Sequence, residues 1–200
     1  MTSDDLIEEV EEIETIIPRA LVVLAEGAEE SEAVIIVDLL RRGGIETVLA
    51  GLNGDGPVLL SRKVRVLPDA ALATAVGDFN ILILPGGAEG ARRLATSELV
   101  GERLKTFSDE GRLVGAICAA PLAFPAHQVF AGRAMTCHPS VASRIAMYGK
   151  LDQRSPVVED GNLITSQGPG TSFLFALTIV RRVMGETRAA EVERGLVLPR

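Results

Sequence analysis

Cys118 is the residue whose setting in the sequence points most directly to chemistry. It follows an apolar, strand-like stretch at 113–117 and precedes a stretch with the pattern of a helix. A nucleophile on a sharp strand-to-helix turn needs small residues two positions to either side, and Ala116 and Ala120 supply them. A thiol at the start of a helix is also expected to have a lowered pKa. The alternative is a buried structural cysteine, and the spacing alone does not decide between the two.

Two glycines follow another strand-like stretch, at 80–84. Gly86 and Gly87 allow close backbone approach, and their N–H groups can line a pocket for an anion. The alternative is an ordinary tight turn. No G-x-G-x-x-G opens the first helical stretch, so a dinucleotide site is not indicated.

Acidic residues and a histidine complete the set of candidates. Glu32 follows the first strand-like stretch together with Glu29 and Glu30, and all three suit the positive end of a helix. His138, at the end of a short strand-like stretch, is a candidate base, whereas His127 lies within a helical pattern and suits a structural role. No group of residues has the spacing of metal ligands, so no metal or other cofactor is expected.

The surrounding pattern predicts how these residues meet. Apolar strands alternate with helical stretches, which is typical of a parallel sheet covered on both faces. Strands are predicted at 20–25, 45–50, 80–84, 113–117 and 134–137, hairpins at 57–67 and 156–166, and helices at 31–42, 89–109, 119–126 and 171–185, the last long helix. Ligands bind beyond the carboxyl ends of such strands, so Glu32, Gly86, Gly87 and Cys118 should converge on one edge.

The charge of the chain is concentrated in its first residues. Residues 1–18 hold seven of the 27 acidic residues and no base, which leaves 20 acidic and 20 basic residues in 19–200. Leu6, Val10, Ile13 and Ile17 predict an amphipathic helix at 4–17. The domain prediction is therefore an acidic helical extension, 1–18, followed by one α/β domain, 19–200. The extension either packs on the domain or binds a partner.

Composition excludes several classes of protein. No cluster of Lys and Arg resembles a nucleic-acid footprint, and no apolar run is long enough to span a bilayer. Two cysteines in 200 residues are not a disulfide framework. The acidic start lacks the features of a signal peptide or a mitochondrial presequence, so the cytoplasm is the expected location.

Five segments of the sequence resemble the ThiJ/PfpI superfamily, and most closely its Parkinsonism-associated deglycase branch. The resemblance covers residues 19–198. The segments are RALVVLAEGAEESEAV, LLRRGGIETVLAGL, ILILPGGAEGA, AICAAP and LITSQGPGTSFLFAL. It implies a flavodoxin-like three-layer α/β sandwich with a mainly parallel sheet, to which the N-terminal helix is an addition, and usually a homodimer.

The same resemblance implies roles for individual residues. Cys118 is the implied nucleophile, Glu32 the acid hydrogen-bonded to it, and His138 a nearby polar residue. Gly87 and Ala119 are the implied oxyanion amides, and Arg62 matches an arginine that lines the pocket from near the partner subunit. Relatives carry other residues at three positions, which are Leu67, Cys137 and Leu174 here.

The implied activity is a cofactor-free glyoxalase or deglycase that converts small α-oxoaldehydes, or their adducts, to 2-hydroxy acids. In that scheme a protonated Glu32 donates to the Cys118 thiolate. The alternatives are a non-enzymatic sensor of oxidative stress, in which Cys118 becomes a sulfinate, and a chaperone-like interaction protein. Because side chains alternate along a strand, Cys137 should point away from the site if His138 points into it.

Overall fold

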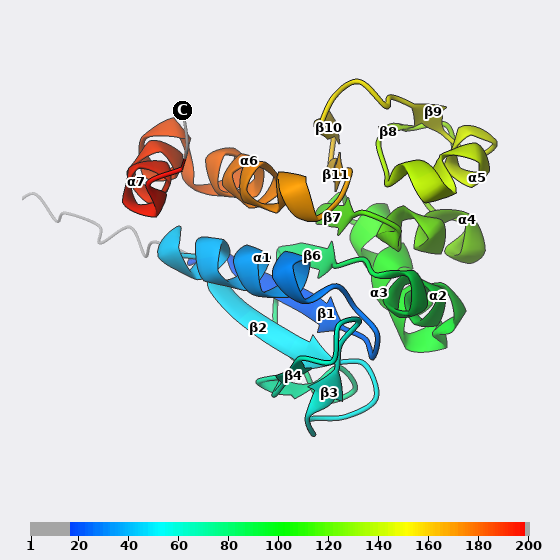
Figure 1. Ribbon diagram of the computed structural model, residues 1–200, viewed down its shortest axis with the longest axis horizontal. Coiled ribbons are helices and arrows are strands. Elements are labelled where there is room, and N and C mark those ends of the chain that lie inside the picture. The colour runs from blue at the N-terminus through cyan, green and yellow to red at the C-terminus, as the bar shows by residue number, and fades with distance from the viewer. Residues whose placement is uncertain (1–16, 199–200) are drawn as a thin grey trace, which may run out of the picture.

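A seven-stranded sheet runs through the centre of the protein, in a computed structural model that describes residues 17–198 (Figure 1). Its strands lie in the order β10-β11-β7-β6-β1-β2-β5. Neighbouring strands are parallel except β10 and β11, which form an antiparallel hairpin at one edge. The strands are β1 (Arg19–Leu24), β2 (Glu46–Gly51), β5 (Ala70–Ala71), β6 (Ile81–Leu84), β7 (Leu113–Ile117), β10 (Val157–Asp160) and β11 (Leu163–Ser166).

Two short ribbons lie outside this sheet. β3 (Val58–Leu59) and β4 (Arg65–Val66) pair antiparallel and form the predicted first hairpin. β8 (Ala134–Met135) and β9 (Lys150–Leu151) pair in parallel.

Helices cover both faces of the sheet. One face carries α1 (Glu30–Arg42), α6 (Ser172–Met184) and α7 (Glu186–Leu196), and Figure 1 shows α1 and α6 side by side. The other face carries α2 (Ala88–Thr96), α3 (Glu98–Asp109), α4 (Ala123–His127) and α5 (Ala142–Ala146). Three short 3₁₀ turns, η1 (Ala120–Leu122), η2 (Pro139–Val141) and η3 (Pro169–Thr171), connect strands to helices. This arrangement confirms the predicted three-layer sandwich with a mainly parallel sheet.

β1 explains why the strands read as continuous apolar runs. Ala20, Val22 and Leu24 join the core beneath α1 and α6. Leu21 and Val23 join the core on the opposite face. Side chains alternate along a strand, so a strand covered on both faces needs apolar residues at every position.

Several predicted bounds differ from the structure. Helix 171–185 is not the last one, because Gly185, with φ +86°, ends α6 and α7 follows it directly. The helical stretches predicted within 89–109 are the two helices α2 and α3, and Ser97 divides them by accepting the Val100 N–H at 3.3 Å and capping α3. The strand predicted at 134–137 ends at Met135.

The predicted helix at 4–17 and most of the 1–18 extension lie outside the described residues. Within residues 17–198, no helix is both long and apolar enough to cross a bilayer.

Candidate active site

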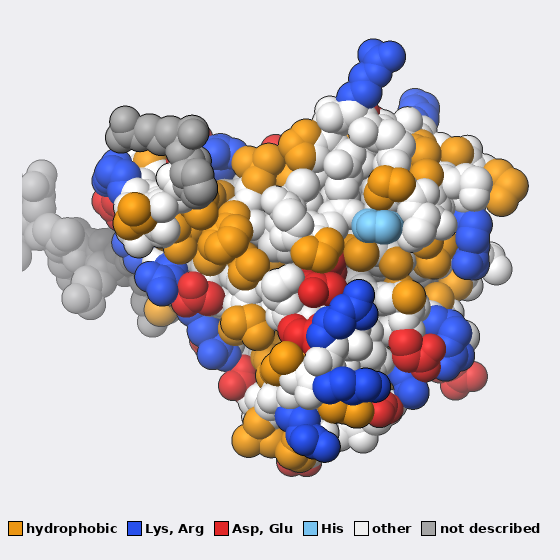
Figure 2. Space-filling view, in the orientation of Figure 1, with side chains coloured by type: hydrophobic (Ala, Val, Ile, Leu, Met, Phe, Trp, Pro, Cys, Tyr) orange, Lys and Arg blue, Asp and Glu red, His pale blue; other side chains and the backbone are white. Residues whose placement is uncertain are grey.

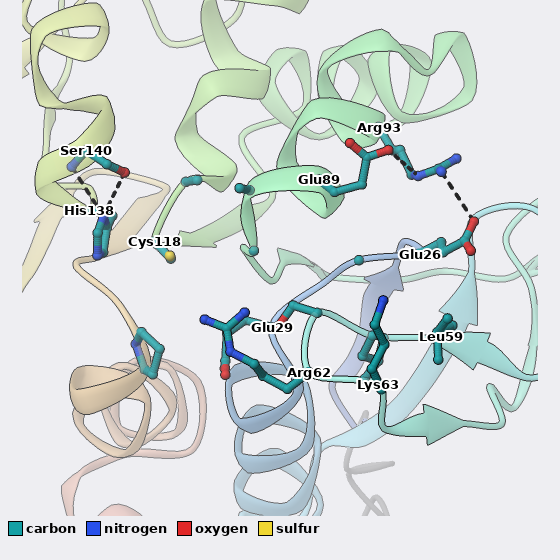
Figure 3. Close-up of a pocket in the computed structure, with 17 residues that line it drawn as sticks. Glu26, Glu29, Leu59, Arg62, Lys63, Glu89, Arg93, Cys118, His138 and Ser140 are labelled. Atoms are coloured by element: carbon teal, nitrogen blue, oxygen red, sulfur yellow. Dashed lines mark hydrogen bonds and ion pairs between the residues drawn. The ribbon is translucent and has the colours of Figure 1, made fainter.

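A cavity of about 510 Å³ opens at the carboxyl ends of β1, β6 and β7 (Figure 3). Its wall includes Cys118, Gly87, Ala119, His138 and Arg62. These are five of the seven residues that the sequence singled out. The other two, Glu32 and Gly86, lie behind this wall against Cys118, as described below.

Cys118 occupies a strained turn between β7 and η1. Its φ of +63° lies in the left-handed region, which a residue with a side chain rarely adopts. The turn is held from both sides, because the Cys118 N–H donates to the Ser166 carbonyl at 2.9 Å and the Cys118 carbonyl accepts the His138 N–H at 2.8 Å. Such conformations cost about 1–3 kcal/mol and persist where the surroundings enforce them, typically at functional sites. The predicted strand-to-helix turn is therefore present, and its sulfur borders the cavity.

Glu32 is fully buried behind the cysteine. One carboxyl oxygen, Oε2, accepts the Gly86 N–H at 2.7 Å, and Oε1 has no hydrogen-bond partner of ordinary geometry. Burial raises the pKa of Glu32 to about 7, against the lowering effect of hydrogen bonds from Gly86 and Cys118. A carboxyl with this pKa is largely protonated below neutral pH and can exchange its proton near pH 7. This position suits a proton carrier.

Gly86 permits the contact between these two side chains. A Cβ at this position would lie 2.5 Å from the Cβ of Cys118, 2.8 Å from the Ile117 carbonyl oxygen and 2.9 Å from Glu32 Oε2. No side chain fits in that space. The alternative of an ordinary tight turn therefore does not account for Gly86, since its missing side chain lets acid and thiol meet.

The Cys118 thiol does not have the expected lowered pKa. Burial raises its pKa to about 12, and the negative charge of Glu32 acts in the same direction. The Gly87 and Ala119 N–H groups oppose this shift by donating to the sulfur. The prediction of a lowered pKa was wrong because only the three-residue turn η1 follows Cys118 directly, so no long helix dipole offsets the burial.

His138 and Ser140 form a small unit beside Cys118, at the side of the cavity away from Glu26 and Arg93 (Figure 3). Nδ1 of His138 accepts the Ser140 N–H at 3.2 Å and lies 2.8 Å from Ser140 Oγ. Since Nδ1 is an acceptor, the hydrogen of the neutral ring is on Nε2. This arrangement favours His138 as a hydrogen-bond donor over the candidate base proposed from the sequence.

The three acids near the end of β1 have three different roles. Glu29 caps α1, since its carboxylate accepts the Glu32 N–H at 2.8 Å. Glu30 binds the hairpin loop, because its carboxylate accepts the Ser61 hydroxyl at 2.5 Å and the Arg62 N–H. Glu32 alone reaches Cys118. All three lie at the start of α1, as the sequence indicated, but only Glu29 caps the helix, and Glu32 has the additional contact with Cys118.

Several residues at the outer rim of the cavity were not identified from the sequence. Arg93 of α2 forms ion pairs with Glu26 at 3.3 Å and with Glu89 at 3.0 Å (Figure 3). Lys63 follows Arg62 on the hairpin and also borders the cavity. Isolated charged residues in loops carry no periodic signal, so only the folded arrangement reveals them.

Cys137 and His127 lie outside the cavity. Cys137 is fully buried in the core beneath α3 and α4, on the other face of the sheet from α1 and α6, and both cysteines are free. His127 makes a 2.9 Å hydrogen bond to the Leu94 carbonyl, in keeping with a structural role. Among the described residues, no group of three or more His, Cys, Asp or Glu is placed to bind a metal ion.

Comparisons with known proteins identify the family and the fold of the chain. The protein dj-1beta of Drosophila melanogaster is 45% identical over 181 residues, which are 90% of this chain and 96% of that protein. The glutathione-independent glyoxalase DJR-1.2 of Caenorhabditis elegans is 39% identical over 181 residues, with the same coverage of both chains. The crystal structure of Drosophila melanogaster DJ-1beta superposes with a TM-score of 0.90 at 42% identity, covering 92% of this chain and all of that one.

These likenesses extend over almost the whole described structure, and the fold is the flavodoxin-like sandwich of those relatives. A sequence model of the DJ-1/PfpI family matches residues 18–182. The chain therefore belongs to the DJ-1/PfpI family.

Proposed function

We propose that the protein is a cofactor-independent glyoxalase that converts α-oxoaldehydes to 2-hydroxy acids through Cys118. The observation that carries this proposal is the contact between a strained, cavity-facing thiol and a buried carboxyl with a pKa of about 7. A nucleophile beside a proton carrier is the pair that such an isomerisation needs. The name of the Caenorhabditis elegans relative, a glutathione-independent glyoxalase, supports the same reaction class.

The first step forms a bond between sulfur and the aldehyde carbon. The ionised Glu32 takes the thiol proton as the sulfur attacks, and the carbonyl electron pair moves onto the aldehyde oxygen. The Gly87 and Ala119 N–H groups, which already point at the sulfur, stabilise that oxyanion. Glu32 then returns this proton to the oxygen, which gives a hemithioacetal and restores the carboxylate.

The second step moves hydrogen between adjacent carbons. Glu32 removes the proton from the former aldehyde carbon, and protonation of the neighbouring ketone oxygen gives an enediol. The former ketone carbon then takes up a proton while the hydroxyl on the former aldehyde carbon loses one, so the hemithioacetal becomes a thioester of a 2-hydroxy acid. In this scheme His138, which lines the same cavity, donates its Nε2–H to the ketone oxygen and stabilises the negative charge there. Water then hydrolyses the thioester and releases the acid and the free thiol.

The direct test is lactate formation from methylglyoxal by the purified protein without glutathione. We expect steady turnover that is unaffected by a metal chelator, because no step requires a cofactor. Lactate can be measured with a coupled dehydrogenase, and the loss of methylglyoxal by its absorbance. Lactate production no faster than in buffer alone would exclude the proposed activity.

We also propose a homodimer that forms through the face carrying α1 and α6. Figure 2 shows hydrophobic side chains gathered where these helices lie side by side. Val34 on α1 is 51% exposed and Leu174 on α6 is 41% exposed, and Leu67, which follows β4, is also exposed. Exposed apolar side chains over neighbouring elements are typical of a subunit interface.

Light scattering should therefore give twice the chain mass of 21.2 kDa at micromolar concentration. Val34→Asp should shift the protein to the monomer mass, because a carboxylate would be buried in the interface. Val76→Asp is the matched control, since Val76 is exposed in the loop after β5, next to Ala75, which packs on the other face of the sheet from α1 and α6. A monomeric mass for the unmodified protein would refute the dimer.

A further inference from the structure

Arg62 and Lys63 are two adjacent cations at the wall of the cavity that contains Cys118. Figure 3 shows both charged ends pointing from the hairpin side into the space bounded by Cys118, His138, Glu26 and Arg93. Neither side chain has a carboxylate within ion-pair distance in the part of the chain that the structure describes, 17–198. Their positive charge is therefore available to a ligand.

The other charges around the cavity have partners. Glu89 pairs with Arg92 and Arg93, and Glu26 pairs with Arg93, so two acids face two bases at this rim. Glu29 accepts the Glu32 N–H and the Ser31 hydroxyl. The charges of the residues that line the cavity cancel, with three acids and three bases, but Arg62 and Lys63 are the two bases among them that no carboxylate pairs with. The hairpin side of the cavity therefore carries two unpaired positive charges.

The loop that carries the two cations is fixed in place. The Leu60 N–H donates to the Val64 carbonyl at 2.9 Å, and the Ser61 N–H donates to the Ala28 carbonyl at 2.9 Å. Lys63 has a φ of +73°, a left-handed backbone conformation that is usually adopted by glycine. A loop held in this way presents its charges with less ordering cost on binding.

The cavity is also much larger than methylglyoxal. Cavities of 300–1,000 Å³ typically enclose ligands of drug size, and methylglyoxal has about five non-hydrogen atoms. With the reacting carbonyl at Cys118 and the oxyanion amides, the cavity continues to the hairpin residues 59–63, which also line it. A larger substrate would extend toward the two cations.

We propose that Arg62 and Lys63 form an anion-binding subsite, and that the preferred substrate is an α-oxoaldehyde carrying a carboxylate or phosphate group beyond its two carbonyls. The substrate part of this inference rests on the proposed glyoxalase function. Guanidinium and ammonium groups are the usual partners of both anions in proteins. The binding part can be tested without turnover.

The first test compares the alkylation of Cys118 by iodoacetate with that by iodoacetamide. The same sulfur attacks both reagents, so the thiolate fraction, and with it the pKa of Cys118, affects both rate constants equally. The ratio of the two rate constants therefore reports the charge around the sulfur. We expect Lys63→Gln to lower the relative rate of the anionic reagent by roughly fivefold at low salt, and Lys63→Arg to preserve it. Arg65→Gln is the control, because Arg65 is an exposed cation on the same hairpin that does not line the cavity. An unchanged ratio in Lys63→Gln would refute the subsite.

The second test compares α-oxoaldehydes that end in a carboxylate or in a phosphate with their methyl esters. We expect a lower KM for each acid than for its ester, and a loss of that difference in Lys63→Gln but not in Arg65→Gln. The two acids separately report which anion is preferred. Equal KM values for acids and esters in the unmodified protein would refute the substrate class. If the alkylation ratio responds as expected but no α-oxoaldehyde is turned over, the glyoxalase proposal fails and the subsite remains.

Discussion

Replacing Cys118 with serine should lower lactate formation from methylglyoxal by about 10⁴-fold or more, the size of effect seen when an enzyme loses its nucleophile. A hydroxyl is a far weaker nucleophile than a thiol, and the buried Glu32 is too weak a base to ionise it. Serine is close to cysteine in volume and can keep the contact with Glu32. The fold should therefore be retained, which circular dichroism and the unfolding midpoint can verify.

Cys137→Ala is the matched control for this variant. Cys137 is equally a free, buried thiol, but it packs in the core on the other face of the sheet. We expect its activity per folded molecule to match that of the unmodified protein. Substantial lactate formation by Cys118→Ser would remove Cys118 from the mechanism. Loss of activity in Cys137→Ala but not in Cys118→Ser would show that the required cysteine is Cys137.

Glu32→Gln should change how stability depends on pH. The pKa of Glu32 is about 7 in the folded protein, against an ordinary value of 4.5. Between these two values the folded state holds a proton that the unfolded state has lost, so the free energy of unfolding falls as pH rises. The contribution of the raised pKa to the free energy of unfolding is therefore fully present below pH 4.5, and it is lost as the pH rises toward and through 7. The loss amounts to about 3 kcal/mol.

Glutamine resembles the protonated acid, because its oxygen can accept the Gly86 N–H without a charge. We therefore expect equal stability of variant and unmodified protein near pH 4.5, and a variant that is more stable by about 3 kcal/mol at pH 8. Urea unfolding of both proteins at a series of pH values measures this difference. The other titrating groups contribute equally to both proteins, so their effects cancel in the comparison. Stability curves that run parallel from pH 5 to pH 8 would show that Glu32 is not the buried acid with the raised pKa.

The same variant should lose roughly 10²–10⁴-fold in turnover, because an amide cannot carry the proton between carbons. Gain of stability together with loss of activity distinguishes this role from a structural one, since a residue needed only for folding would lose both. The comparison requires a pH at which both proteins are fully folded.

The sequence predicted the elements of this fold more reliably than their roles in the site. Apolar runs such as 80–84 identify strands because burial on both faces of a sheet leaves no polar position. By contrast, Glu29, Glu30 and Glu32 have the same charge and lie within four residues. Only the fold separates the helix cap, the loop anchor and the acid beside the thiol.

The resemblance to a known family identified Cys118 and Glu32 as site residues, but it did not predict how their surroundings shift their pKa values. The expected low pKa of Cys118 came from helix geometry alone, whereas the depth of the thiol and the charge behind it determine the result. Lys63 was missed for a similar reason. Its exposed position is ordinary in a sequence, and its significance depends on which carboxylates are absent around it.

The two hydrogen bonds that hold the Cys118 backbone have a consequence for biosynthesis. Both come from residues that follow it in the chain, His138 and Ser166. A ribosome-bound chain that ends before Ser166 already contains the thiol and Glu32, yet it lacks a restraint on the left-handed turn that aims the sulfur. The reactive geometry is therefore completed only after the strand at 163–166 has joined the sheet beside 113–117. Until then, the growing chain contains Cys118 without the backbone geometry that directs its sulfur into the cavity.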